Sequence, residues 1–200
     1  MKWSSPLSDG DLLKYSADHV AYEVEMFFTV GQSVLHNAWA TPNDRALLES
    51  FIVHLRSLMD FLYPTSGLKP TDIIAAYYFK EKSSWQATRP SPHASLLKAR
   101  DRAHKQLVHL TTGRVTGDPQ WKIRDLLLAM RPPLVTFTTA ASPGLLDPAV
   151  ERAIPPARAL SQMPVFSTST STPVVIRVSP PAPAPTFGDE CDASQRPGMM

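Results

Sequence analysis

The chain has 200 residues, a formal net charge of +2 and a single cysteine, Cys191. A charge this close to balance excludes binding of nucleic acid through overall electrostatic attraction, so any basic site must be local. One cysteine excludes an internal disulfide framework, and the sequence holds no run of eighteen apolar residues and no apolar stretch typical of a secretory signal. We therefore expect a soluble cytoplasmic protein without membrane contacts.

The composition changes near residue 142 and divides the chain into two parts. Residues 1–141 carry frequent charges and apolar residues at helical spacing, and a segment of roughly this length can bury a core without disulfides. Residues 142–200 are dominated by Pro, Ser, Thr and Ala, which predicts a disordered tail. This proline-rich tail could bind a proline-reading protein partner, although a passive extension is the favoured interpretation.

Apolar residues at steps of three and four predict that the first part is all-α, an up-and-down bundle of four to five helices. The first helix is expected to begin at Ser8, which can form a capping box with Asp11. Its apolar seam includes Gly31, where a partner helix can approach closely. The helix is expected to end near Trp39.

The central helix of the bundle is predicted over residues 45–63, and its apolar residues fill one broad arc. Asn43 can cap this helix, and the short connection favours an antiparallel arrangement with the first helix. His54 lies at the edge of the arc, where we expect a hydrogen-bonded core histidine.

Three further elements are predicted before the tail. They are a short helix over residues 73–79 capped by Thr71 or Asp72, a third long helix over residues 91–115, and a last helix from Asp118 to about Ala140 that is kinked at Pro132 and Pro133. Residues 81–92 are predicted to form a loop with Trp85 as its packing anchor. The core stripe of the third long helix includes Leu96, Ala99 and Ala103, and Leu97 is expected to widen it.

Most familiar catalytic signatures are missing, and the histidines have no carboxylate at a recognised metal spacing, so no cofactor or metal is predicted. The exception is a row of cationic and titratable residues on the third long helix, opposite its core stripe. The row consists of Lys98, Arg102, Lys105 and His109.

Arg102 and His109 are seven residues apart, about two helical turns, so they project from nearly the same line. Histidine can move a proton near neutral pH, and arginine can grip a phosphate with two donors. Together they could cleave RNA without a metal, with His109 as general acid or base, Arg102 as phosphate clamp, and Lys98 and Lys105 steering the backbone. A two-fold dimer would bring two such helices face to face.

The pair resembles the motif of the HEPN superfamily, which is an arginine, four to six residues, and a histidine. Six residues separate Arg102 from His109. The resemblance implies an up-and-down bundle of four to five helices over about residues 8–140, with the motif on a late helix. It also implies an RNase or nucleotide-binding role, often in toxin–antitoxin or phage-defence systems, and commonly a homodimer.

Two other interpretations stay open. The row can be a solvated basic face without a ligand, because some residues of any bundle helix must point outward. The protein can also be a non-enzymatic helical interaction module, whose partner binds the bundle surface or the proline-rich tail.

Overall fold

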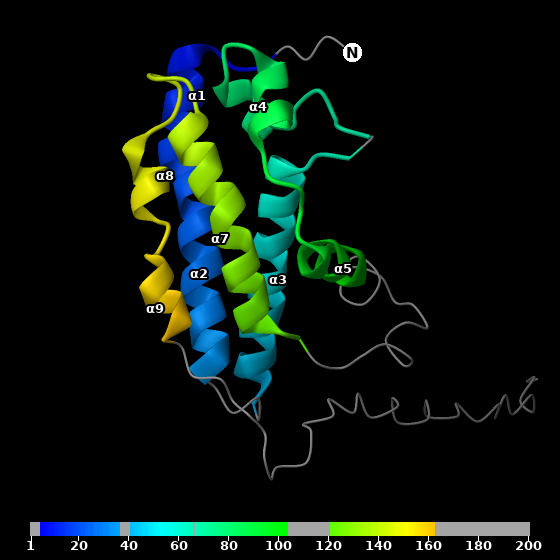
Figure 1. Ribbon diagram of the computed structural model, residues 1–200. Helices are drawn as coiled ribbons and strands as arrows, with labels where there is room; N and C mark the ends of the chain where they lie inside the picture. The colour runs from blue at the N-terminus through cyan, green and yellow to red at the C-terminus, as the bar shows by residue number, and fades with distance from the viewer. Residues whose placement is uncertain (1–4, 37–40, 66, 104–120, 163–200) are drawn as a thin grey trace, which may run out of the picture.

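The computed structural model describes residues 5–36, 41–65, 67–103 and 121–162, and it confirms an all-α bundle (Figure 1). The elements in chain order are α1 (Asp9–Tyr15), the π-helix η1 (Ser16–Val20), α2 (Ala21–His36), α3 (Pro42–Leu62), the 3₁₀-helix η2 (Ala75–Tyr78), α4 (Lys82–Thr88), α5 (Ala94–Ala103), α7 (Ile123–Ala140), α8 (Pro148–Arg152) and α9 (Ala157–Ser161). No helix in these ranges combines the length and apolar character that crossing a membrane requires.

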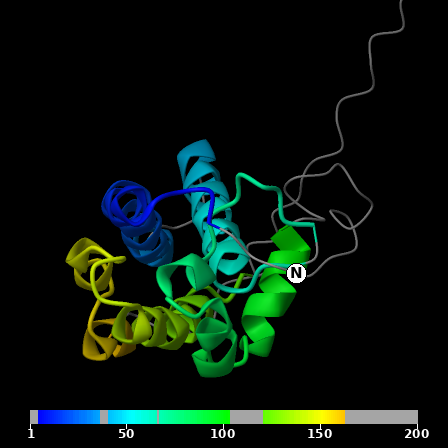
Figure 2. The same cartoon turned by 90° about the horizontal axis from the view of Figure 1, so that it is seen from above.

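Three long helical segments run alongside one another: α1 with η1 and α2, then α3, and then α7 (Figure 1). Helices α2 and α3 run in opposite directions and pack together, as the short connection predicts. Helix α5 lies across the side of the bundle and contacts α3 and α7, and Figure 2 shows it from above. Helices α8 and α9 cover α2 and α7.

The first helical segment begins at the predicted cap. The Ser8 hydroxyl accepts a hydrogen bond from the Asp11 backbone N–H at 3.2 Å and donates to the Asp11 carboxylate at 2.6 Å. The π-helical turn η1 was not predicted. There the buried Ser16 hydroxyl donates to the Leu13 carbonyl at 2.7 Å and accepts from the Asp147 backbone N–H at 2.8 Å. This turn therefore holds a segment that is 131 residues away in the sequence.

Helix α3 is the predicted central helix, but the prediction of Asn43 as its cap is wrong. Thr41 is the N-cap residue: its hydroxyl accepts from the Asp44 N–H at 3.3 Å, and the Asp44 carboxylate accepts from the Thr41 N–H at 2.8 Å. A capping box needs an acidic or amide side chain three residues after the cap. Asp44 stands there for Thr41, whereas Ala46 follows Asn43 at that spacing.

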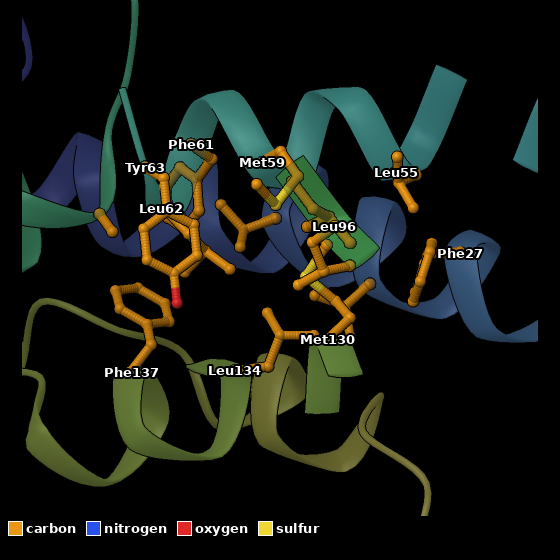
Figure 3. Packing of buried hydrophobic residues seen from close by; sticks show 14 of the residues in the cluster. Phe27, Leu55, Met59, Phe61, Leu62, Tyr63, Leu96, Met130, Leu134 and Phe137 are labelled. Atoms are coloured by element: carbon orange, nitrogen blue, oxygen red, sulfur yellow. The ribbon is translucent and has the colours of Figure 1, made fainter. Parts of the chain in front are cut away.

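The interior lies between α2, α3 and α7. Figure 3 shows Met59 and Leu62 of α3 facing Met130 and Leu134 of α7, and all four are fully buried. Near the end of α3 an aromatic cluster forms, consisting of Phe61, Tyr78, Phe79, Trp85 and Phe137. The Phe137 ring centroid lies 5.2 Å from that of Phe61 and 5.5 Å from that of Tyr78, in edge-to-face geometry.

Helix α2 comes close to its neighbours at Gly31, as the small-residue position in its seam predicts. A Cβ atom added to Gly31 would lie 2.7 Å from Cδ2 of Leu127 and 2.8 Å from Cε2 of Phe51. Both distances are below van der Waals contact, so only glycine fits at this crossing without displacement of the core.

Residues 81–92 were predicted to form a loop, but they contain helix α4. Trp85 within it is fully buried and its indole N–H donates to the Leu62 carbonyl at 2.9 Å, which confirms Trp85 as a packing anchor. The preceding 3₁₀-helix η2 has Ile74 at its N-cap position and no side-chain cap, so the predicted caps Thr71 and Asp72 are wrong.

Helix α5 buries Leu96, Ala99 and Ala103, which confirms the predicted core stripe within the described residues. The prediction that Leu97 widens this stripe is wrong, because its side chain is exposed. Helix α5 packs only its Leu96 side against α3 and α7, since it lies across the bundle rather than within it. The predicted continuation to residue 115 lies outside the described residues.

Helix α7 ends at the predicted Ala140 and continues through Pro132 and Pro133. The two prolines have no backbone N–H, so the helix lacks two hydrogen bonds. Leu134 and Phe137 beyond the prolines are fully buried, and their packing offsets this loss. The predicted kink stays a prediction. The predicted start at Asp118 lies outside the described residues.

The prediction of a disordered tail from residue 142 is wrong for residues 142–162. Asp147 caps α8 by accepting from the Ala149 N–H at 2.8 Å, and α8 and α9 bury Val150 and Leu160 completely. Helix α7 holds this segment, because Arg131 Nε donates to the Pro155 carbonyl at 2.9 Å. Each short helix contributes too few apolar residues for a helical period to be visible. The rest of the predicted tail, residues 163–200, lies outside the described residues.

Candidate functional site

The basic row predicted on the third long helix is only partly described. Lys98 is exposed and Arg102 is half-buried, whereas Lys105 and His109 lie outside the described residues. The guanidinium carbon of Arg102 lies 4.0 Å from the centroid of the Trp121 ring, which is a close cation–π contact. Arg102 therefore contributes to packing between the end of α5 and the chain that enters α7.

A second arginine fixes α5 against the end of α3. The Arg100 guanidinium donates through Nη1 to the Tyr63 carbonyl at 3.1 Å, and Ala99 and Ala103 on either side of it are buried. This contact holds one wall of a groove on the outer side of α3.

We call this depression the α3 groove. It consists of two adjoining cavities of about 540 and 520 Å³ that share Asp60, Leu68 and Asp72. The α2 end is also lined by Tyr15, His19, Val20, Tyr22, Glu23, Ser57, Leu58, Phe61, Thr71, Ile73 and Ile74, and the α5 end by Arg56, Pro64, Thr65, Gly67, Leu97, Arg100 and Asp101. The groove thus passes from α2 across α3 to α5, beneath the connection between α3 and η2.

Exposed apolar side chains gather in this groove. Among the described residues four large apolar side chains are exposed, and three of them line the groove: Tyr22 at 50%, Leu97 at 39% and Leu68 at 36%. The fourth, Val53, is 60% exposed and belongs to neither cavity. Single exposed apolar residues are common on proteins, but several that line one depression are typical of an interaction site.

The two ends of the α3 groove differ in charge. The α2 end has the carboxylates of Glu23, Asp60 and Asp72, and no lysine or arginine lines it among the described residues. The α5 end is also lined by Arg56, Arg100 and Asp101, and Arg56 lies beside Asp60, with 3.6 Å between Nε and Oδ2. The groove therefore carries a negative charge that is concentrated toward α2.

A carboxylate–histidine pair lies at the same crossing of α2 and α3. Glu23 Oε2 is 2.9 Å from Nδ1 of His54, and His54 is buried, which confirms the predicted hydrogen-bonded core histidine. The Tyr22 ring packs edge-on against the His54 ring, with 5.8 Å between centroids. His54 itself lines neither cavity, so we interpret the pair as a clasp between two helices rather than as catalytic machinery.

The π-helical turn supplies the upper wall at the α2 end. There the rings of Tyr15 and His19 pack together with 4.6 Å between centroids. Burial raises the pKa of the Tyr15 hydroxyl, and the charge of Glu23 raises it further, so Tyr15 presents a neutral phenol to the groove.

Within the described ranges no group of three or more His, Cys, Asp or Glu residues could hold a metal ion.

The sequence does not predict this groove. Its walls come from Tyr15 of α1, from η1, α2, α3 and α5, and from the loop before η2, so no single helical pattern predicts them together. Leu97, an apolar residue beside the core stripe of α5, is a signal of the groove in the sequence, but the same position also fits a wider core stripe.

Comparison with known proteins finds no family model, no curated protein and no solved structure that matches this chain.

Proposed function

We propose that this protein is a non-enzymatic helical interaction module, and that a segment of a partner protein binds in the α3 groove. The observation that carries the proposal is the gathering of Tyr22, Leu68 and Leu97 in one depression, while Val53 is the one other large apolar side chain exposed among the described residues. The Glu23–His54 hydrogen bond joins α2 to α3 beside this depression, and His54 lines neither cavity, which agrees with a structural role for the pair.

The expected affinity follows from the exposed apolar surface. Complete burial of a large apolar side chain is worth about 1.5–3 kcal/mol, and these three are already half covered or more, so each would gain on the order of 1 kcal/mol. Association itself costs at least several kcal/mol. Apolar contacts alone therefore give weak binding, and polar or charged contacts must add to them.

Site-specific photo-crosslinking in the full chain tests this proposal. A photoreactive amino acid at Leu68 or Leu97 should give discrete adducts with a partner, and the same amino acid at Val53 should not. The identified partner is then purified, and Leu68→Asp combined with Leu97→Asp should weaken its binding at least tenfold, whereas Val53→Asp should leave the affinity unchanged. Equal binding by both variants would overturn the proposal.

We propose, as a second function, an HEPN-like role in binding RNA or a nucleotide, with metal-independent RNA cleavage by Arg102 and His109 in a homodimer. The supporting observation is that Lys98 is exposed four residues before Arg102 on α5, where it can reach a phosphate backbone. RNA cleavage by the purified chain in the presence of a metal chelator tests this role.

The control for that assay comes from the contact between Arg102 and Trp121. Arg102→Ala removes both the proposed phosphate clamp and the packing on Trp121, whereas Trp121→Ala removes only the packing. Loss of cleavage in Arg102→Ala and His109→Ala, with retention in Trp121→Ala, would support the nuclease role. Residual activity that is equal in all three variants would contradict it.

A further inference from the structure

We infer that the segment bound in the α3 groove is a basic one, with apolar residues and at least two lysine or arginine side chains. This inference rests on the proposed interaction function and adds the chemistry of the partner. It follows from the distribution of charge and apolar surface along the groove.

The carboxylates of the groove are positioned to meet incoming cations. Asp60 is half-exposed, and its contact with Arg56 is long at 3.6 Å. Asp72 accepts from the Lys69 backbone N–H at 2.7 Å, which fixes the carboxylate at the rim. A carboxylate has about four acceptor positions, so this bond leaves Asp72 able to accept from a second donor.

The apolar side chains lie between and beyond these carboxylates. Leu68 belongs to both cavities together with Asp60 and Asp72, so apolar and acidic groups alternate over the middle of the groove. Tyr22 lies at the α2 end and Leu97 at the α5 end. Packed helices are about 8–10 Å apart, so the distance from α2 across α3 to α5 is roughly 20 Å. A segment of about six extended residues covers that distance.

Charge complementarity selects among the possible occupants. An acidic segment would meet Glu23, Asp60 and Asp72 at an end where no lysine or arginine lines the described surface, and like charges at an interface are strongly unfavourable. A purely apolar segment would cover these carboxylates without adding a donor to the contacts they already make with His54, Arg56 and the Lys69 N–H. A segment with lysine or arginine beside its apolar residues can pack against Leu68 and Leu97 and can pair its cations with the carboxylates.

The inference is tested by selection from a displayed library of random 16-residue peptides on the immobilised full chain. Peptides that also bind a Leu68→Ser variant, which removes the apolar contact without adding a charge, are removed. The recovered peptides should be enriched in lysine and arginine next to leucine, isoleucine or aromatic residues. Their affinity should fall at least fivefold when NaCl rises from about 0.05 to 0.5 M, because salt screens exposed charge pairs.

Two variants separate the charge contribution from the fold. Asp60→Asn with Asp72→Asn keeps the side-chain size and the acceptor for the Lys69 N–H, and it should weaken a recovered basic peptide about tenfold. Glu49→Gln changes an exposed charge on α3 outside the groove and should leave the affinity unchanged. Thermal melting of each variant checks that the fold is intact.

The outcomes distinguish this inference from the proposed function. Peptides that need Leu68 but are neutral or acidic, and that bind the asparagine variant equally well, would overturn the basic partner and leave the interaction function standing. Failure to recover any peptide that needs Leu68 would overturn both. A dimer that dissociates in Leu68→Asp would identify a second copy of the chain as the occupant and would also overturn the basic partner.

Discussion

The interior of the bundle and the α3 groove both contain large apolar side chains, which differ in how far they are covered. In the interior Phe51, Leu55 and Met59 of α3 have no exposed surface and belong to the hydrophobic core. In the α3 groove Leu68, from the loop after α3, and Tyr22 of α2 remain exposed. Apolar residues therefore occur in both regions, and the exposed fraction of their side chains distinguishes the core from the groove. Substitutions in the two regions should differ accordingly.

The largest effect is expected in the aromatic cluster. Phe137→Ala removes a ring that packs against Phe61, Tyr78 and Trp85, and we expect a loss of about 3–5 kcal/mol in the free energy of unfolding. Urea denaturation followed by circular dichroism measures it. Phe137→Leu should lose less, and a loss below about 1 kcal/mol in Phe137→Ala would show that the cluster is not part of the stable core.

A smaller loss is expected where the helices cross at Gly31. An added methyl group would overlap Leu127 and the buried Phe51 ring, at a cost of about 1–3 kcal/mol, while the higher helix propensity of alanine returns up to about 1 kcal/mol. Gly31→Ala should therefore destabilise the protein by roughly 1 kcal/mol. Gly10→Ala is the matched control, because nothing lies within 4 Å of its added methyl group, and it should be neutral or stabilising.

The clasp between Glu23 and His54 should contribute a similar or smaller amount. Glu23→Ala leaves the buried His54 without its 2.9 Å partner, and a loss of about 1 kcal/mol is expected in denaturation experiments at neutral pH. Glu25→Ala removes an exposed carboxylate two residues away in the same helix and should change the stability by less than about 0.5 kcal/mol. Equal effects of the two substitutions would show that the clasp contributes nothing.

Tyr78 should matter little at neutral pH and more at alkaline pH. Its hydroxyl donates a long 3.4 Å hydrogen bond to the Leu12 carbonyl, so Tyr78→Phe should cost less than about 1 kcal/mol at pH 7. Burial raises the pKa of the Tyr78 hydroxyl in the folded state, and the nearby Tyr15 raises it further. The stability linked to this group is therefore complete below the unfolded pKa of about 10 and falls as the pH rises above it.

Urea denaturation at about pH 8 and pH 10.5 measures this dependence. Stability of the wild-type chain should fall between the two values, and the fall should be shallower in Tyr78→Phe. The same slope in both proteins would show that Tyr78 is not the group responsible.

The smallest effect is expected in the α3 groove. Leu68→Ala shortens a side chain that is 36% exposed in the loop after α3, and the free energy of unfolding should change by less than about 0.5 kcal/mol. If Leu68→Ala loses partner binding while its free energy of unfolding is unchanged, Leu68 serves binding and does not stabilise the core. A loss above about 2 kcal/mol would mean that Leu68 is a core residue.

The features that the sequence predicts correctly are those that depend on a local pattern of residues. The Ser8 cap, the apolar arc of α3, buried His54 and the anchor Trp85 all follow from residues close together in the chain, and all are confirmed. Thr41 was missed because two candidate caps stand two residues apart, and only the reciprocal bond to Asp44 distinguishes them.

The groove and the later helices could not be predicted in the same way. The groove joins Tyr22, Leu68 and Leu97, which are far apart in the sequence, so their proximity depends on how α5 lies across the bundle. Helices α8 and α9 each bury a single large apolar side chain completely, and one such residue per helix cannot show a helical period. The packing role of Arg102 depends on the contact between its guanidinium and the Trp121 ring, which the sequence does not predict.

The position of α8 and α9 has a practical consequence for shortening this chain. The composition break near residue 142 looks like a natural boundary, but Val150 and Leu160 beyond it are fully buried against the bundle. A fragment that stops at residue 141 would bare the apolar flanks of α2 and α7 and should self-associate during expression. A fragment that extends through residue 162 keeps both helices and is the better choice for crystallisation or NMR.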